Sequence, residues 1–169
     1  MVSKFIALQK EYPKKLIKKG DRILYLGASH GVTAKILSKI VNKEGFIYCL
    51  EKAPKVIPEL IKICEKHKNL APLYFNASKP EEYKKYIKEI NLIYQDIAQP
   101  DQIEILLKNI KQFLKKGTFI LMVKSHSIDV TKDKKEIIKL VKQKLKDYNI
   151  DIIDLSKTHK EHYAIIGKI

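Results

Sequence analysis

The sequence predicts an α/β domain: a mostly parallel sheet of seven strands, helices on both faces, and an antiparallel hairpin at the C-terminus. Short apolar runs, each long enough for a strand, alternate five times with helical patterns along the chain. The last two apolar segments, 150–155 and 162–169, have no helix between them. Because parallel neighbours need a long crossover connection, these two segments should pair antiparallel.

The first segment, residues 3–18, has apolar positions at Phe5, Ile6 and Leu8 and is interrupted by Pro13. Proline cannot continue a helix from within, so this pattern predicts one short helix. A turn at Gly20-Asp21 then leads into the first strand.

The stretch RILYLGASHGVT (22–33) combines a buried strand, a glycine turn and a helix start. Gly27 and Gly31 form the turn, and a helical pattern follows from Val32 to Val41. Glycines let a ligand approach the backbone, and the free N–H groups of a helix start point outward. Two glycines are equally compatible with an ordinary strand-to-helix turn. Other features must therefore decide whether this loop binds a ligand.

The second strand, FIYCLE (46–51), ends in Glu51. An acid about twenty residues beyond a glycine loop, at a strand tip, can accept hydrogen bonds from the two hydroxyls of a ribose. A charge that stabilises the next helix start is the alternative. The spacing favours the ribose site.

The remaining elements follow from the same patterns. The strand 118–124 is apolar throughout and should lie inside the sheet. The other predicted elements are a helix over Ala53–Lys66 with Pro54 in its first turn, a strand over 70–76, a helix opened by a capping box at Ser78–Glu81, a strand over 91–96, and helices over Pro100–Lys116 and Thr131–Asp147.

Five parallel strands followed by a hairpin are typical of the Rossmann-like fold of S-adenosylmethionine-dependent methyltransferases. A nicotinamide dehydrogenase would more usually continue with a sixth parallel unit and carry G-x-G-x-x-G. Here the spacing is G-x-x-x-G, from Gly27 to Gly31. The loop therefore favours a ligand that contains an adenosine but no phosphates.

The composition is strongly basic, with 34 Lys and Arg against 19 Asp and Glu, a formal net charge of +15. Such an excess favours binding to a polyanion, nucleic acid above all. Lysine-rich chains also arise from biased base composition or heat adaptation, so charge alone does not decide.

The sequence has two cysteines, Cys49 and Cys64, without CxxC spacing, so neither a zinc site nor a disulfide framework is predicted. No apolar run approaches membrane-spanning length, and residues 1–15 lack the continuous apolar core of a signal peptide. We expect a cytoplasmic protein with no metal and no membrane partner.

Four motifs make a more specific resemblance: LYLGASHGVT (24–33), KPEEY (79–83), IYQDIAQP (93–100) and VKSHSIDVTK (123–132). In this order and spacing they closely resemble archaeal fibrillarin. That family comprises the 2′-O-methyltransferases of box C/D guide ribonucleoproteins. The likeness extends from Ser3 to the C-terminus and implies methylation of ribosomal or transfer RNA.

The resemblance implies a catalytic set of lysine, aspartate, lysine and histidine, matched here by Lys4, Asp96, Lys124 and His162. Because the carboxyl ends of parallel strands meet at one edge, Asp96 and Lys124 can lie side by side. We assign ribose activation to Lys124 and orientation near the donor methyl to Asp96. Lys4 and His162 then position the substrate.

The same resemblance implies which residues contact the methyl donor, S-adenosylmethionine. They lie in the glycine loop and helix start, at the tips of the second and third strands, and in the loop after the fourth: Gly27, Val32, Thr33, Glu51, Lys52, Asn76, Ala77, Asp96, Ile97, Ala98 and Gln99.

Two segments depart from the family pattern. The glycine loop usually reads G-A-A-S-G-T-T, whereas this chain has His30 and Val32 in it. The aspartate after the third strand is replaced by Asn76, which can accept a hydrogen bond but carries no charge. We expect a lower affinity for the donor.

Archaeal members usually carry an N-terminal β-rich extension, whereas this sequence begins almost at the Lys4 segment, so we interpret residues 1–169 as a single methyltransferase domain. The implied partners are a guide RNA with its target RNA, a Nop-type coiled-coil scaffold and a kink-turn-binding ribosomal protein. Two alternatives stay open: a catalytically weakened paralogue that serves as a structural subunit, and a methyltransferase that acts without a guide.

Overall fold

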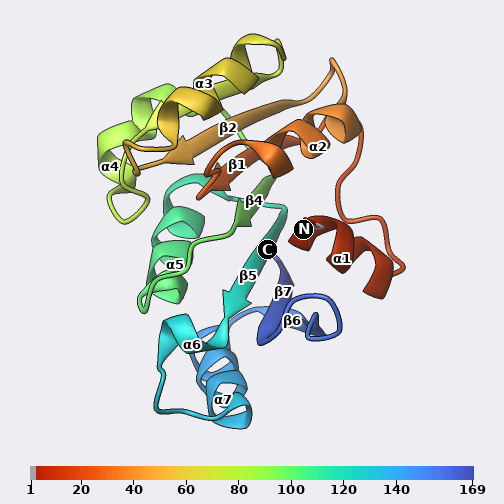
Figure 1. Ribbon diagram of the computed structural model, residues 1–169, viewed down its shortest axis with the longest axis vertical. Helices are drawn as coiled ribbons and strands as arrows, with labels where there is room; N and C mark the ends of the chain where they lie inside the picture. The colour runs from red at the N-terminus through yellow and green to blue at the C-terminus, as the bar shows by residue number, and fades with distance from the viewer. Residues whose placement is uncertain (1–2) are drawn as a thin grey trace.

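The protein, described by a computed structural model over residues 3–169, contains a single seven-stranded sheet (Figure 1). Its strands are β1 (Arg22–Leu26), β2 (Phe46–Glu51), β3 (Leu70–Tyr74), β4 (Leu92–Gln95), β5 (Thr118–Lys124), β6 (Asn149–Asp154) and β7 (His162–Lys168). They lie in the order β3-β2-β1-β4-β5-β7-β6. Strands β1 to β5 are parallel, and β7 runs antiparallel to both β5 and β6. The predicted sheet and its terminal hairpin are confirmed.

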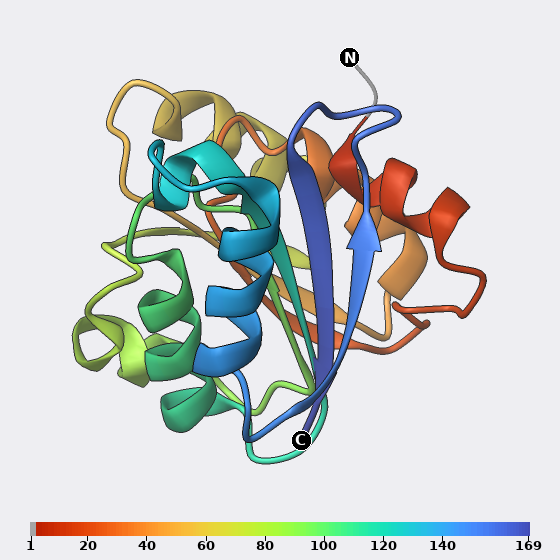
Figure 2. The same cartoon turned by 90° about the horizontal axis from the view of Figure 1, so that it is seen from below.

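Helices cover both faces of the sheet, as Figure 2 shows. They are α1 (Lys4–Glu11), α2 (Val32–Val41), α3 (Ile57–Glu65), α4 (Pro80–Tyr83), the 3₁₀ helix η1 (Lys84–Tyr86), α5 (Gln102–Phe113), α6 (Ser125–Ile128) and α7 (Lys134–Lys144). Side chains of α1, α2 and α3 enter the core on one face, and those of α4, α5 and α7 enter the core on the other. None of these helices is long and apolar enough to cross a membrane.

Burial on both faces explains why the inner strands read as continuous apolar runs. In β1, Ile23 and Tyr25 belong to the core beneath α1 to α3, whereas Leu24 and Leu26 belong to the opposite core. Strand β5 lies between β4 and β7, as its apolar sequence predicts. Strand β3 contains Pro72 and forms one edge of the sheet, where a missing N–H leaves no gap in a ladder.

The predicted starts of α3, α4 and α7 are wrong. Helix α7 begins at Lys134 rather than at Thr131. Local side-chain hydrogen bonds explain the other two differences. Helix α3 begins at Ile57, with Pro58 rather than Pro54 in its first turn. Before it, the Glu51 carboxylate accepts the N–H groups of Lys52 and Ala53, which draws those residues into the loop.

Helix α4 begins after Lys79 and has no side-chain cap. The N–H of Ser78 donates to Asn76 Oδ1 at 3.0 Å, so Ser78 belongs to the turn after β3. A capping box does occur elsewhere: Asp133 and Glu136 cap each other's backbone at the start of α7. The short helix α6, which follows β5 directly, has no counterpart in the predicted elements.

Strands β5 and β7 approach each other closely where Gly167 faces Phe119. The two residues are opposite each other in the ladder. A Cβ atom placed on Gly167 would lie 2.1 Å from Cζ of Phe119, whose ring is fully buried. The glycine therefore provides the space that the ring occupies.

We predict that Gly167→Ala lowers the free energy of unfolding by about 1–3 kcal/mol, because the added methyl group overpacks this contact. Urea denaturation followed by circular dichroism measures the change. Combining it with Phe119→Leu should cost less than the sum of the two single changes, since the smaller side chain relieves the clash. Additive costs would contradict the overpacking explanation.

Candidate active site

The carboxyl ends of β1, β2 and β4 are joined by backbone hydrogen bonds. The N–H groups of Gly27 and Ala28 donate to the Leu50 carbonyl at 2.9 and 3.0 Å, and that of Asp96 donates to the Leu26 carbonyl at 2.9 Å. The glycine loop, the tip of β2 and the loop after β4 therefore meet at one edge of the sheet.

Gly27 allows this close meeting. Its φ of +82° lies in the left-handed region, and a Cβ atom there would lie 2.6 Å from the carbonyl oxygen of Asp96. Any side chain at this position would push the loop after β4 away from β1. The glycine therefore determines where the Asp96 carboxylate lies.

Two adjoining pockets open at this edge. The larger, of about 410 Å³, is lined by Gly27, Ser29, Leu50, Glu51, Lys52, Phe75, Asn76, Ala77, Asp96, Ile97, Ala98 and Gln99. The smaller, of about 290 Å³, is lined by Lys4, Tyr25, Gly27, Ala28, Ser29, His30, Val32, Thr33, Asp96 and Ala98. Four residues line both pockets: Gly27, Ser29, Asp96 and Ala98.

All of the donor-binding residues predicted from the sequence lie in the walls of these pockets. Val32 and Thr33 line the smaller one, and the others line the larger one. From the larger pocket the prediction omitted two apolar wall residues, Leu50 and Phe75, each of which directly precedes a predicted polar residue. From the smaller pocket it omitted Tyr25, Ala28 and His30. It also omitted Ser29 from the glycine loop.

Glu51 organises the polar side of the larger pocket. Its Oε2 accepts the Ser29 N–H at 2.8 Å, and its Oε1 accepts the N–H groups of Lys52 and Ala53, each at 2.8 Å. Oε2 keeps acceptor capacity for a ligand hydroxyl, because a carboxylate oxygen has two lone pairs. Across the pocket, the Lys52 ammonium donates to Gln99 Oε1 at 3.1 Å.

Asn76 lies in the turn after β3 with its amide partly engaged. Oδ1 accepts the Ser78 N–H at 3.0 Å, whereas Nδ2 has no hydrogen-bond partner within residues 3–169. An amide in this arrangement can offer a ligand both a donor and a remaining lone pair.

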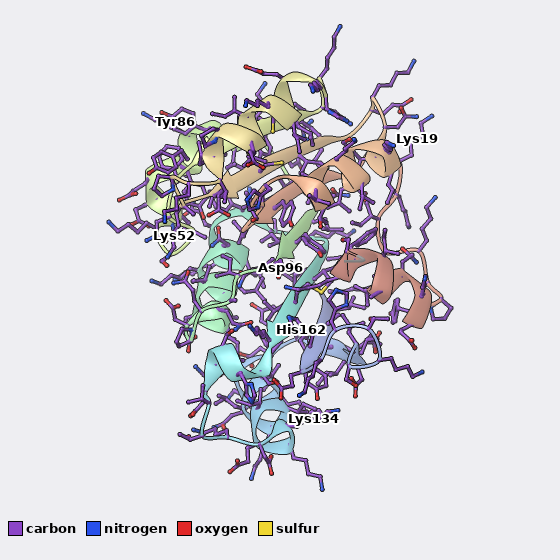
Figure 3. The ribbon with its side chains drawn as sticks, viewed as in Figure 1. Lys19, Lys52, Tyr86, Asp96, Lys134 and His162 are labelled. Carbon is purple, nitrogen blue, oxygen red and sulfur yellow. The ribbon has the colours of Figure 1, made fainter. Side chains whose placement is uncertain are left out.

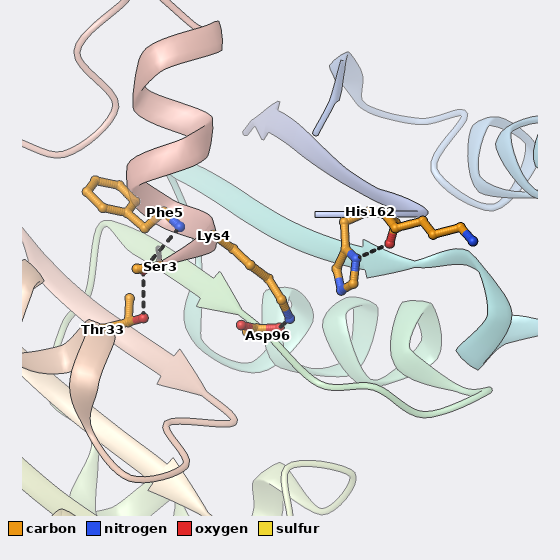
Figure 4. A network of polar contacts seen from close by, with 7 residues as sticks. Ser3, Lys4, Phe5, Thr33, Asp96 and His162 are labelled. Carbon is orange, nitrogen blue, oxygen red and sulfur yellow. Dashed lines mark hydrogen bonds and ion pairs between the residues drawn. The ribbon is translucent and has the colours of Figure 1, made fainter. Parts of the chain in front are cut away.

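Lys4 extends from the first turn of α1 to Asp96, with Nζ 2.5 Å from Oδ1 (Figure 4). The helix start is fixed by Ser3, whose Oγ accepts the Phe5 N–H and lies 3.0 Å from Oγ1 of Thr33. The Lys4 and Asp96 side chains are 25% and 20% exposed, so a ligand can reach both.

Lys124 is the last residue of β5 and lies opposite His162 in the β5–β7 ladder. Its side chain is exposed, and its ammonium has no ion pair or hydrogen bond with any residue that the structure describes. The ion pair of Asp96 forms with Lys4, although the strand order suggested Lys124 as the neighbour. Lys124 therefore lies at the same edge of the sheet but does not contact the acid.

His162 begins β7, and its ring lies near Lys4 and Asp96 (Figures 3 and 4). Its pKa is lowered below the ordinary value, first by burial and further by the positive charge of Lys4. Nδ1 lies 2.7 Å from the Lys160 carbonyl, which can only accept, so Nδ1 carries the proton. In the neutral ring Nε2 is therefore a hydrogen-bond acceptor.

Two buried tyrosines, Tyr25 and Tyr94, lie within reach of the Asp96 charge. The rings of Tyr25 and Tyr94 pack edge to face, with centroids 4.9 Å apart. Burial raises the pKa of both hydroxyls well above the usual value, and the Asp96 charge raises it further. Both stay neutral at physiological pH.

Within residues 3–169, no group of Asp, Glu, His and Cys could hold a metal ion.

The sequence model of the fibrillarin family matches residues 3–169. The chain belongs to the fibrillarin family. Curated fibrillarin-like rRNA/tRNA 2′-O-methyltransferases from Methanocaldococcus jannaschii and Pyrococcus furiosus are 42% and 41% identical to it over 155 and 153 residues. Each match covers 89% of this chain and 67% of the relative, so the chain spans about two thirds of the length of these relatives.

Solved fibrillarin structures have the same fold. The fibrillarin pre-rRNA processing protein of Methanococcus jannaschii superimposes with a TM-score of 0.93 at 40% identity, over 98% of this chain and 74% of that one. A fibrillarin/Nop5p complex gives 0.93 at 39% identity, over 98% and 80%. Aeropyrum pernix fibrillarin with natively bound S-adenosyl-L-methionine gives 0.88 at 33% identity, over 97% and 74%.

We predict that two charge-removing variants move the pKa of His162 in opposite directions. Lys4→Met should raise it, because a neighbouring positive charge that disfavours the imidazolium is removed. Asp96→Asn should lower it, because the charge that favours the imidazolium is lost. NMR titration of the imidazole signals measures both shifts.

The signals of His67, which hydrogen-bonds to the Ile63 carbonyl at the end of α3, serve as the internal reference. Shifts of His162 in the same direction in both variants would contradict its electrostatic coupling to the Lys4–Asp96 pair.

Proposed function

We propose that this fibrillarin-family chain methylates ribose 2′-hydroxyl groups of ribosomal and transfer RNA, with S-adenosylmethionine as the methyl donor. The observation that carries the proposal is the Lys4–Asp96 pair at the junction of the two pockets. An acid and an amine stand where a donor in the pockets would meet a substrate from solvent. The names of the curated relatives support the same reaction.

The residues present fit the donor. Leu50, Phe75 and Ile97 provide apolar walls for an adenine, and Glu51 keeps acceptor capacity for a ribose hydroxyl. The smaller pocket is more polar and suits the amino-acid end of the molecule. A pocket of this size and mixed lining is typical of small-molecule sites. When bound, S-adenosylmethionine supplies an electrophilic methyl group on a sulfonium.

The chain's own residues then act on the ribose hydroxyl, which is a weak acid and a poor nucleophile. The Lys124 ammonium, which has no partner among residues 3–169, stabilises negative charge as it develops on the 2′-oxygen. Nε2 of neutral His162 accepts a hydrogen bond from the sugar. The Lys4 ammonium holds the Asp96 carboxylate in one orientation, so the acid presents a fixed charge beside the donor site.

We propose a Nop-type protein as the partner that places the chain on its RNA. A fibrillarin/Nop5p complex with the same fold supports this partner. A guide RNA and a kink-turn-binding protein complete the proposed assembly. The net charge of +15 suits contact with RNA backbone, which provides affinity but no choice of sequence.

A structural subunit without catalysis is the second candidate, because Asn76 and Val32 replace residues of the usual donor site. Calorimetry with S-adenosylmethionine distinguishes the two. Measurable binding supports the enzymatic function, whereas no binding at a millimolar concentration of S-adenosylmethionine supports the structural role.

We predict that Lys124→Ala lowers the rate of methyl transfer by at least about 100-fold and leaves donor affinity nearly unchanged. Transfer of a labelled methyl group gives the rate, and calorimetry gives the affinity. Lys168→Ala is the matched control: this lysine ends β7 opposite Thr118, at the far edge of the sheet, and its loss should change neither quantity. Loss of donor binding together with activity would make Lys124 structural.

We also predict that methylation of a guided target requires the complete assembly. Guide RNA, Nop-type scaffold and kink-turn protein are added one at a time to this chain and a labelled target RNA. Site-specific methylation should appear only with all of them, because the chain relies on partners to select the nucleotide. Full activity of the chain alone would instead identify a guide-independent enzyme.

A further inference from the structure

We propose that His30 binds the carboxylate at the amino-acid end of the methyl donor. The inference rests on the proposed function, since it assigns a residue of the same donor site. His30 lies in the wall of the smaller pocket together with Lys4 and Thr33.

The orientation of the His30 ring is set by its neighbour. Nδ1 of His30 lies 3.0 Å from Oγ of Ser29. When that hydroxyl donates to Nδ1, the proton of a neutral ring is on Nε2, which has no partner within residues 3–169. An imidazole in this tautomer is a hydrogen-bond donor, and a carboxylate is the acceptor that favours it.

Ser29 is in turn fixed by the larger pocket. Its backbone has a φ of +49°, which is uncommon for a residue with a side chain, and its N–H donates to Glu51 Oε2 at 2.8 Å. Glu51, Ser29 and His30 therefore form a continuous chain of hydrogen bonds from the proposed ribose site to the smaller pocket.

The shape and polarity of the pockets determine which end of the donor faces His30. Apolar walls and the Glu51 carboxylate suit the adenosine in the larger pocket. The residues common to both pockets, including Asp96, then lie beside the sulfonium. The charged amino and carboxylate groups extend into the smaller pocket.

Other side chains of the smaller pocket are poorly placed to bind that carboxylate. The Thr33 hydroxyl already pairs with Ser3 Oγ, 3.0 Å away. Val32 has no polar side-chain atom, and the Lys4 ammonium is directed to Asp96. His30 offers this pocket a side-chain N–H that has no partner within residues 3–169 and whose chemistry matches a carboxylate.

The test compares two ligands that differ in the proposed contact. S-adenosylhomocysteine carries the amino-acid end, and 5′-methylthioadenosine has the adenosine and sulfur but no carboxylate. For His30→Ala, calorimetry should show about tenfold weaker binding of the first ligand and unchanged binding of the second. His30→Gln, which keeps an N–H donor, should recover part of the loss. Ser29→Ala should also weaken the binding of the first ligand and not that of the second, but by a smaller factor than His30→Ala.

His67→Ala is the matched control, a histidine far from both pockets, and should bind both ligands as the unaltered chain does. Unchanged binding of 5′-methylthioadenosine also shows that the His30 variant is folded. If His30→Ala weakened the binding of both ligands equally, the proposal would be overturned, and His30 would be a structural part of the loop. If the His30→Ala variant bound both ligands with unchanged affinity but bound RNA more weakly, the proposal would be overturned, and His30 would instead contact an RNA phosphate. If the unaltered chain bound neither ligand, the proposed function itself would fail.

Discussion

The contact between the backbones of Gly27 and Asp96 is the constraint on which the rest of the site depends. Because residue 27 has no side chain, the end of β1 lies directly against the loop that follows β4. The Asp96 carboxylate is thereby held at the junction of the two pockets. The glycine loop serves two purposes: it forms the floor of the donor site, and it fixes the acid that faces the substrate.

The Lys4–Asp96 pair contributes more to position than to stability. Both side chains are partly exposed, and exposed ion pairs contribute little to the free energy of folding, about 0–1 kcal/mol. Its consequence is geometric, because it joins α1 to the end of β4, 92 positions away in the sequence. Ser3 reinforces the same junction through Thr33. The first helix is thus an integral wall of the active site.

The sequence determines the strands well because burial on both faces leaves unmistakable apolar runs, as in β1 and β5. It fails at the starts of α3 and α4, where the Glu51 and Asn76 side chains bind the N–H groups of nearby residues and hold those residues in turns. Such competition depends on side-chain orientation, which periodicity does not report. The residues of the pockets could be named from family motifs, but the partner of Asp96 could not. Strand order points to Lys124, whereas only the three-dimensional path of α1 brings Lys4 to the acid.

The departures from the family loop make a consistent physical set. An uncharged Asn76 loses the charge-assisted hydrogen bond that an aspartate would make, but it gains an N–H donor. Val32 removes a hydroxyl from the smaller pocket, whose Thr33 is already engaged, and His30 adds a donor to the same wall. Each change moves hydrogen-bonding capacity from one group to another without closing a pocket. The two pockets therefore differ from the usual pattern in the hydrogen-bonding groups that they offer an adenosyl ligand.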